Sequence, residues 1–161
     1  MGYTHYFPHG KTTLKKWGEI LDDCEKLAAA DDTPIVANTY TQTKEGWDTK
    51  SGAPIFDNTE IRFNGVAEAS HEDFLLLRGG VKKQDYEKDR TEKYGFTFCK
   101  TAAKPYDLLV CACLLVYVHY SPDTIELGSD GGPQDWAQAE KLVKDVLGYD
   151  MSYSEITGET E

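Results

Sequence analysis

The sequence predicts an α+β fold, a single domain in which a mainly antiparallel sheet packs with about three helices. Short segments of alternating apolar and polar residues and three longer segments with helical spacing indicate this class. The 161 residues suffice for one core, and 40% hydrophobic with 28% charged residues is typical of a globular protein. We expect one domain over residues 1–150 and a polar, frayed C-terminal tail over residues 151–161.

The first predicted elements are a strand and a helix. The strand is YTHYF at residues 3–7, which Pro8 ends. Thr12 or Thr13 then caps a helix that runs to about Ala29. The apolar residues at helical spacing, which predict its buried face, are Leu14, Trp17, Leu21, Cys24, Leu27 and Ala28.

The middle of the chain predicts short strands separated by polar segments. Ile35 to Asn38 is a short strand, and Thr39 to Pro54 is an ordered loop or a loose hairpin. Two further strands are predicted at Thr59–Asn64 and Asp73–Leu77. The charged segment from Gly79 to Glu92 is expected to be exposed.

The last part of the chain predicts two strands and two helices. Tyr94 to Lys100 alternates and predicts a strand, and Thr124 to Leu127 predicts another. Pro105 opens a helix that is apolar nearly all round, so we expect burial on more than one side. A final amphipathic helix ends at Gly148. Its inward residues are expected to be Trp136, Leu142, Val143 and Val146.

Charge and hydropathy exclude several classes of protein. The net charge is −11, which disfavours binding to duplex nucleic acid. Residues 78–104 nevertheless contain eight basic and four acidic residues, so this segment can hold a small anion. The longest apolar run, Leu108 to Val118, is too short to span a bilayer, and the first residues lack the apolar region of a signal peptide. We therefore expect no membrane association and a cytoplasmic location.

Cysteine and motif patterns predict neither disulfides nor a cofactor. The four cysteines contain no CxxC pair, and reduced, mostly buried thiols are expected at Cys24, Cys99, Cys111 and Cys113. His5 and His9 have metal-like spacing, but Pro8 interrupts them and no further ligand lies at a matching interval, so no metal site is predicted. Walker, GxGxxG and GxSxG motifs are absent from the sequence.

The stretch FTFCKTAAKPYD, residues 96–107, is the richest candidate for a binding site. It places polar side chains at a strand-to-helix junction, where free N–H groups and the helix dipole favour an anion. Tyr106 is suited to stacking on a base. The alternative is a local cap, solvated lysines and a tyrosine in the core. The candidate residues are Lys100, Thr101, Lys104, Tyr106 and Asp107.

Two further groups of polar residues are candidates. SDGG, which begins at Ser129, lets backbone N–H groups converge, while Asp130 either binds a ribose hydroxyl or caps the next helix. His5, on the predicted face of Tyr3, and His71 are candidate acid and base for a phosphodiester, with Glu72 orienting an imidazole. Such catalysis requires the two histidines to meet, and otherwise they are structural.

Five motifs occur in order along nearly the whole folded part of the chain: MGYTHYF, FNG at Phe63, HEDF at His71, FCKTAAKPYD at Phe98 and SDGGPQDW at Ser129. Together they resemble a family of small proteins found mostly in phage genomes. The resemblance implies a location in an infected bacterial host and adds Asn64 to the candidate ligand-binding residues.

The resemblance implies a role in phage counter-defence. The leading hypothesis is binding and sequestration of a small anionic nucleotide signal, a cyclic oligonucleotide or a cyclic ADP-ribose relative, with Tyr106 or Tyr3 stacking on its base. A metal-independent phosphodiesterase that cleaves such a signal is the alternative, and an acidic protein-interaction module is the third possibility. Sequestering proteins are often oligomers, so by analogy a homo-oligomer is also considered.

Overall fold

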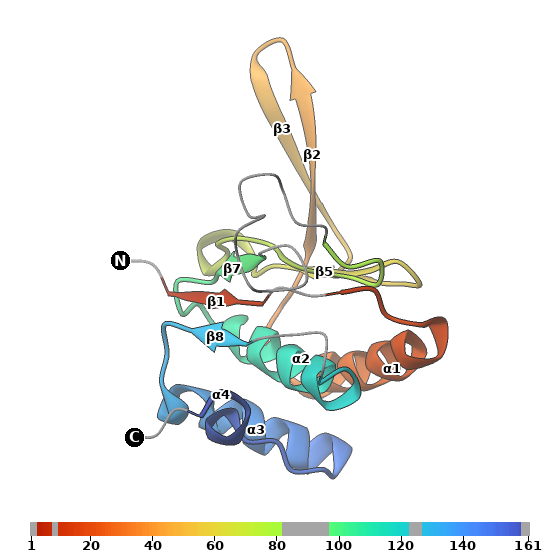
Figure 1. The fold of residues 1–161 in the computed structure, drawn as a ribbon. Helices are drawn as coiled ribbons and strands as arrows, with labels where there is room; N and C mark the ends of the chain where they lie inside the picture. The colour runs from red at the N-terminus through yellow and green to blue at the C-terminus, as the bar shows by residue number, and fades with distance from the viewer. Residues whose placement is uncertain (1–2, 8–9, 82–96, 123–126, 159–161) are drawn as a thin grey trace, which may run out of the picture.

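The structure is a computed structural model that describes residues 3–7, 10–81, 97–122 and 127–158. Within these residues, helices and short antiparallel strands form an α+β domain, as predicted. Figure 1 shows the strands above, α1 and α2 beneath them, and α3 with α4 below. The helix α2 therefore lies in the middle of the molecule.

The sheet nearest the candidate site has β1 (Thr4–Tyr6) at its centre. β7 (Phe98–Lys100) and β8 (Gly128–Ser129) pair with it antiparallel, one on each side. His5 is thereby opposite both Cys99 and Ser129. Of the strands predicted here, residues 94–96 and 124–126 lie outside the described residues, as does most of the predicted exposed segment 79–92.

The helix α1 (Leu14–Ala30) begins as predicted, because the Thr13 side chain accepts a hydrogen bond from the Lys16 N–H at 3.3 Å. Its buried face contains Trp17, Ile20, Cys24 and Leu27. The prediction for Leu14 was wrong: this side chain is 64% exposed. Leu14 is the first helical residue and precedes the turn that packs on the core.

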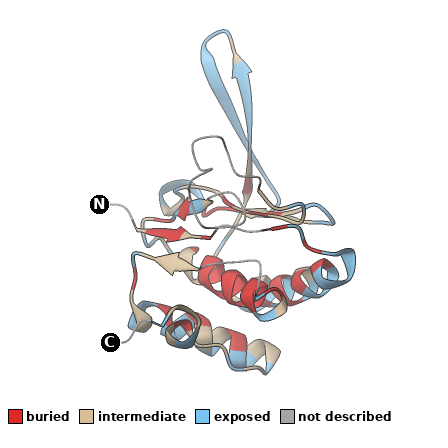
Figure 2. Cartoon of the chain, in the orientation of Figure 1, coloured by how far each residue is buried: buried red, intermediate tan, exposed pale blue. Residues whose placement is uncertain are grey.

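The helix α2 (Asp107–Tyr120) confirms the prediction of burial on several sides, because every residue from Leu109 to Val118 is buried. It contacts α1 and α3, and Figure 2 shows its buried surface in the centre of the fold. No helix in the described part of the chain combines the length and the apolar composition needed to cross a membrane.

The C-terminal part of the chain forms α3 (Pro133–Leu147) and α4 (Tyr153–Thr157). α3 ends at Gly148, whose φ of 85° suits a glycine. Residues 151–158 differ from the frayed tail that was predicted. Tyr153 is fully buried and stacks on Trp136 at 4.6 Å between ring centroids, which fixes this segment on the domain.

The middle of the chain forms two further antiparallel sheets. The segment predicted as a loose hairpin is a regular one, β2 (Ala37–Thr43) with β3 (Gly46–Gly52), and it projects from the domain in Figure 1. The other sheet contains β4 (Ile55–Phe56), β5 (Glu60–Phe63) and β6 (Phe74–Leu77). A 3-10 turn at Ala67–Ala69 connects β5 to β6.

Candidate functional site

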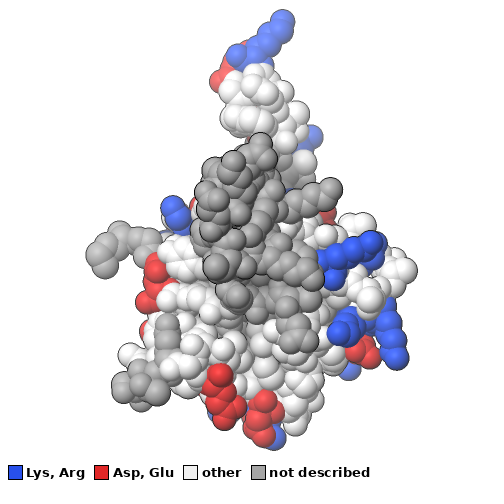
Figure 3. Space-filling view, in the orientation of Figure 1, with Lys and Arg blue, Asp and Glu red and all other residues white. Residues whose placement is uncertain are grey.

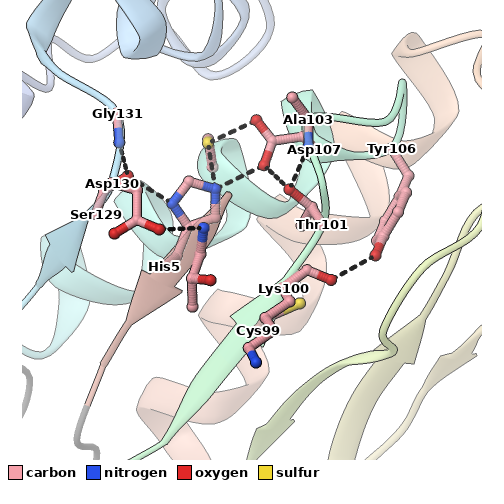
Figure 4. A network of polar contacts seen from close by, with 12 residues as sticks. His5, Cys99, Lys100, Thr101, Ala103, Tyr106, Asp107, Ser129, Asp130 and Gly131 are labelled. Carbon is pink, nitrogen blue, oxygen red and sulfur yellow. Dashed lines mark hydrogen bonds and ion pairs between the residues drawn. The ribbon is translucent and has the colours of Figure 1, made fainter. Parts of the chain in front are cut away.

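His5 is the centre of a buried polar network that joins three parts of the chain (Figure 4). Its Nδ1 lies 2.8 Å from the Ser129 Oγ, which is the cross-strand neighbour on β8. Its Nε2 lies 2.6 Å from the Asp107 Oδ1 in the first turn of α2. The ring also packs edge-on against Tyr3 and Trp136. These contacts fix the position of a fully buried imidazole.

Asp107 connects His5 to two further side chains. Its Oδ1 accepts a hydrogen bond from the Thr101 hydroxyl at 2.6 Å. Its Oδ2 lies 3.6 Å from the Cys111 Sγ, one helical turn further along α2. The Cys111 Sγ is also 3.5 Å from the His5 Nε2. We call His5, Thr101, Asp107, Cys111 and Ser129 the His5 cluster.

The turn before α2 has an unusual backbone. Ala102 and Ala103 both have positive φ, 52° and 54°, a region that costs a residue with a side chain on the order of 1 kcal/mol. The turn is closed by a hydrogen bond from the Lys104 N–H to the Thr101 carbonyl at 3.0 Å. It brings the Thr101 hydroxyl to Asp107 and places Lys104 beside the start of α2.

Tyr3 and Asp130 hold the edges of the cluster. Burial of Tyr3, together with the Asp107 carboxylate, raises the pKa of the tyrosine hydroxyl above its usual value. A Cβ on Gly131 would overlap the Tyr3 hydroxyl oxygen, so a larger residue there would force the Tyr3 side chain to move. The Asp130 carboxylate accepts hydrogen bonds from the Thr4 N–H at 3.1 Å and from the Tyr6 hydroxyl at 3.3 Å. Asp130 therefore fixes β8 to β1.

A pocket of about 200 Å³ lies over the Asp107 and Cys111 side of the cluster. Its polar lining comes from Lys104, Asp107 and Asp135, with Gln138 beside them. The apolar part of the lining is Ala103, Pro105, Leu108 and Ala139. The pocket thus combines one cation and two carboxylates with an apolar wall.

A second group of polar residues surrounds Asn64, which is buried. The Asn64 amide donates to the His71 carbonyl and to Asp73, and its Oδ1 accepts from two backbone N–H groups. The Tyr106 hydroxyl donates to the Glu72 carbonyl at 2.5 Å. We call Asn64, His71, Glu72, Asp73 and Tyr106 the Asn64 cluster.

The Asn64 cluster holds loops together rather than facing a ligand. All four hydrogen-bonding positions of the Asn64 side chain are in use, and Tyr106 is fully buried. The proposed stacking of Tyr106 on a base does not agree with this burial. The Glu72 carboxylate accepts from the Lys100 N–H at 3.0 Å, so it binds backbone and not an imidazole.

The two candidate catalytic histidines are not in contact. The His5 ring contacts Ser129, Asp107 and Cys111, whereas His71 is exposed. The two candidate lysines also differ, because Lys104 lines the pocket while Lys100 is exposed with its Nζ 5.7 Å from the Phe98 ring centroid. The structure brings together His5, Tyr3, Thr101, Asp107 and Ser129 around one centre.

Sequence reasoning missed three residues of the site, Cys111, Asp135 and Gln138. Cys111 was expected to be an inert buried thiol, and burial with the nearby Asp107 carboxylate does raise the pKa of this thiol. The spacing of Asp107 and Cys111, four residues apart on a helix, is a signal that they share one face.

The described residues on the face in Figure 3 do not form the basic stripe that is typical of duplex binding. Their basic side chains lie apart from one another, some on the hairpin and others at the edges of the domain. A comparison of the chain with protein-family models, curated proteins and solved structures found no match.

Proposed function

We propose that this protein binds and sequesters a small anionic nucleotide signal, of the cyclic oligonucleotide or cyclic ADP-ribose type, in phage counter-defence. The observation that carries the binding proposal is the pocket beside Lys104, which has charges of both signs on its lining. The class of signal and the biological role rest on the resemblance of the sequence motifs to phage proteins.

The pocket lining suits a nucleotide better than a bare phosphate. The Lys104 ammonium supplies a positive charge for a phosphate oxygen. The carboxylates of Asp107 and Asp135 repel phosphate but accept hydrogen bonds from ribose hydroxyls and exocyclic amines. The apolar wall offers contact area for a base or the face of a sugar. A ligand with all three kinds of group matches this arrangement.

The size of the pocket limits how much of the ligand it takes. Its volume of about 200 Å³ is below the roughly 300–1,000 Å³ of pockets that enclose drug-sized ligands. One base or one sugar therefore enters, and the rest of the ligand lies outside. Lys104 is half-buried and lines this pocket, which supports a contact with the phosphate that joins the enclosed part of the ligand to the rest.

The experiment incubates the purified protein with cyclic dinucleotides, cyclic trinucleotides and cyclic ADP-ribose isomers. Each mixture is then chromatographed before and after heat denaturation. Sequestration predicts that one ligand disappears from the free pool and returns intact on heating. A new product on heating would indicate cleavage, and ligands that all stay free would contradict the proposal and leave a protein partner as the third possibility.

A pair of lysine variants locates the binding site. Lys104→Glu is expected to weaken binding at least about tenfold, because it reverses the charge of the one cationic side chain that lines the pocket among the described residues. Lys141→Glu is the matched control, since Lys141 is exposed on α3 and pairs with Asp145. Equal affinity of the two variants, measured by calorimetry with the retained ligand, would place binding elsewhere.

A further inference from the structure

The His5 cluster contains three side chains that are each common metal ligands, an imidazole, a carboxylate and a thiol. The possible donor atoms of His5, Asp107 and Cys111 all lie within 4.8 Å of one another. They come from two elements, since His5 is on β1 while Asp107 and Cys111 lie one turn apart on α2. The pairing of β1 in the sheet and the packing of α2 therefore bring the group together.

The separations between the donor atoms resemble those in a zinc site. With bonds of about 2.0–2.3 Å and tetrahedral angles, neighbouring ligand atoms lie roughly 3.3–3.6 Å apart. The Cys111 Sγ lies 3.5 Å from the His5 Nε2 and 3.6 Å from the Asp107 Oδ2. The 2.6 Å between the His5 Nε2 and the Asp107 Oδ1 is a hydrogen bond, which a metal ion would replace.

Outer hydrogen bonds hold two of these ligands in position. The Ser129 Oγ contacts the His5 Nδ1 at 2.8 Å, which leaves Nε2 directed at the other two side chains. The Thr101 hydroxyl donates to the Asp107 Oδ1 at 2.6 Å, so Oδ2 remains on the side of Cys111. Supporting contacts of this kind orient the ligands of metal sites in proteins.

The pocket offers a further coordination position. Both Asp107 and Cys111 line it, whereas His5 is fully buried behind them. A metal held by these three residues would therefore have one side open to a water molecule or a bound molecule. Three protein ligands and one open position are typical of catalytic zinc sites, and four protein ligands of structural ones.

We infer that His5, Asp107 and Cys111 bind a single Zn²⁺ ion, with its fourth position open to the pocket. When the ion binds, the Cys111 thiol releases its proton to solvent and bonds through the thiolate. The hydrogen on the His5 Nε2 is replaced by the ion, and Nδ1 carries the imidazole proton toward Ser129. One thiolate and one carboxylate balance the two positive charges of zinc.

This inference does not rest on the proposed nucleotide ligand, and its test uses metal ions alone. The full chain is stripped with a chelator, loaded with Zn²⁺ or Co²⁺ and passed through gel filtration. We expect one retained ion per chain by elemental analysis. With Co²⁺ we expect a thiolate-to-cobalt charge-transfer band and the visible bands of a four-coordinate ion.

The variants separate the proposed site from the other thiols. Cys111→Ser is expected to lose the charge-transfer band and to bind at least about tenfold more weakly. Cys99→Ser is the matched control. Cys99 is also buried and lies on β7, next to β1, but its sulfur is directed toward the carbonyls of Glu72 and Asp73. Ser129→Ala is expected to weaken binding by about 10–100-fold, as for other outer contacts.

Three outcomes would overturn the inference. They are a wild-type chain that retains less than about one tenth of an ion, a cobalt complex without a charge-transfer band, and a band that Cys99→Ser abolishes. If Cys111→Ser does not fold, the melting temperature of the wild-type protein tests the inference instead. Bound Zn²⁺ must raise this temperature, and a chelator must reverse the rise. A protein that binds zinc but no nucleotide would refute only the proposed function.

Discussion

The His5 cluster and the Asn64 cluster contain similar polar residues, but they differ in how their hydrogen bonds are used. In the Asn64 cluster, the central amide makes all of its bonds to the protein. In the His5 cluster, Asp107 is 16% exposed and lines a pocket together with Lys104. A polar residue in one of the sequence motifs therefore stabilises the fold when the protein uses all of its hydrogen-bonding positions. It is available to a ligand when part of its side chain lines a pocket.

The largest expected effect tests a property that both regions share, a buried thiol. Burial raises the pKa of Cys111 in the His5 cluster and of Cys99 beside the Asn64 cluster. In the unfolded chain these thiols ionise near pH 8.5, whereas in the folded chain they stay protonated to higher pH. Stability is thus complete below about pH 8.5 and falls as the pH rises, by about 1.4 kcal/mol per pH unit for each thiol.

Urea unfolding between pH 7 and 10.5 measures this loss. Cys99→Ala and Cys111→Ala should each reduce the slope of the free energy of unfolding against pH by about 1.4 kcal/mol per pH unit. The reason is that each variant removes one thiol with a raised pKa. In each variant, the other of these two thiols and Cys24, whose pKa burial also raises, sustain the remaining decline. A free energy of unfolding that stays constant up to pH 10 would contradict the burial of these thiols.

The next largest effect concerns the structural cluster. Asn64→Ala is expected to lower the free energy of unfolding by about 3 kcal/mol, because it removes all four hydrogen bonds of the buried amide, although Asp73 keeps those from Asn38 and Arg62. Urea denaturation checks the value. Asn58→Ala, at an exposed position, is the control and should change stability by less than about 0.5 kcal/mol.

A smaller loss of stability is expected for a variant in the His5 cluster. Ser129→Ala should cost about 1 kcal/mol, since His5 keeps its hydrogen bond to Asp107 and Ser129 is only half-buried. Ser51→Ala, on the exposed β2–β3 hairpin, is the control and should lower the free energy of unfolding by a few tenths of a kcal/mol at most. If Ser129→Ala cost as much as Asn64→Ala, the two clusters would be equally structural and the contrast between them would be lost.

The smallest expected effect is a gain in stability. Ala103→Gly relieves a positive φ of 54°, worth about 1–2 kcal/mol, against the roughly 0.5–1 kcal/mol of entropy that glycine costs. The variant should therefore be more stable by about 0.5 kcal/mol in thermal unfolding. Ala137→Gly, at an exposed position inside α3, should instead lose about 1 kcal/mol. A loss in both would show that this turn carries no strain.

The sequence predicted the local features of the fold better than the contacts between distant segments. The Thr13 cap, the all-round burial of α2 and the end of α3 at Gly148 depend on neighbouring residues, and all three were correct. The segment of the β2–β3 hairpin was expected to be an ordered loop or a loose hairpin because it is polar and contains glycine, whereas it forms regular strands. Tyr153 was placed in a tail because the polar residues around it hide its contact with Trp136.

The site was only partly predictable for the same reason. Tyr3, His5, Thr101, Asp107 and Ser129 were candidates from their types and motifs, and they lie around one centre. Their convergence required the pairing of β1 with β8, across a sequence separation of 124 residues between His5 and Ser129. The contact of Cys111 with His5 depends on the packing of α2 against β1, across a sequence separation of 106 residues, so the short spacings that reveal many metal sites did not reveal this one.

The central position of β1 also determines when the site can form during synthesis. β1 leaves the ribosome before both of its partner strands, β7 and β8, which lie far downstream in the sequence. His5 can therefore pair with Cys99 first, but it lacks its partner Ser129 until residue 129 has emerged. Pairing then closes a loop of more than a hundred residues, a slow step in which early segments are exposed to chaperones and proteases.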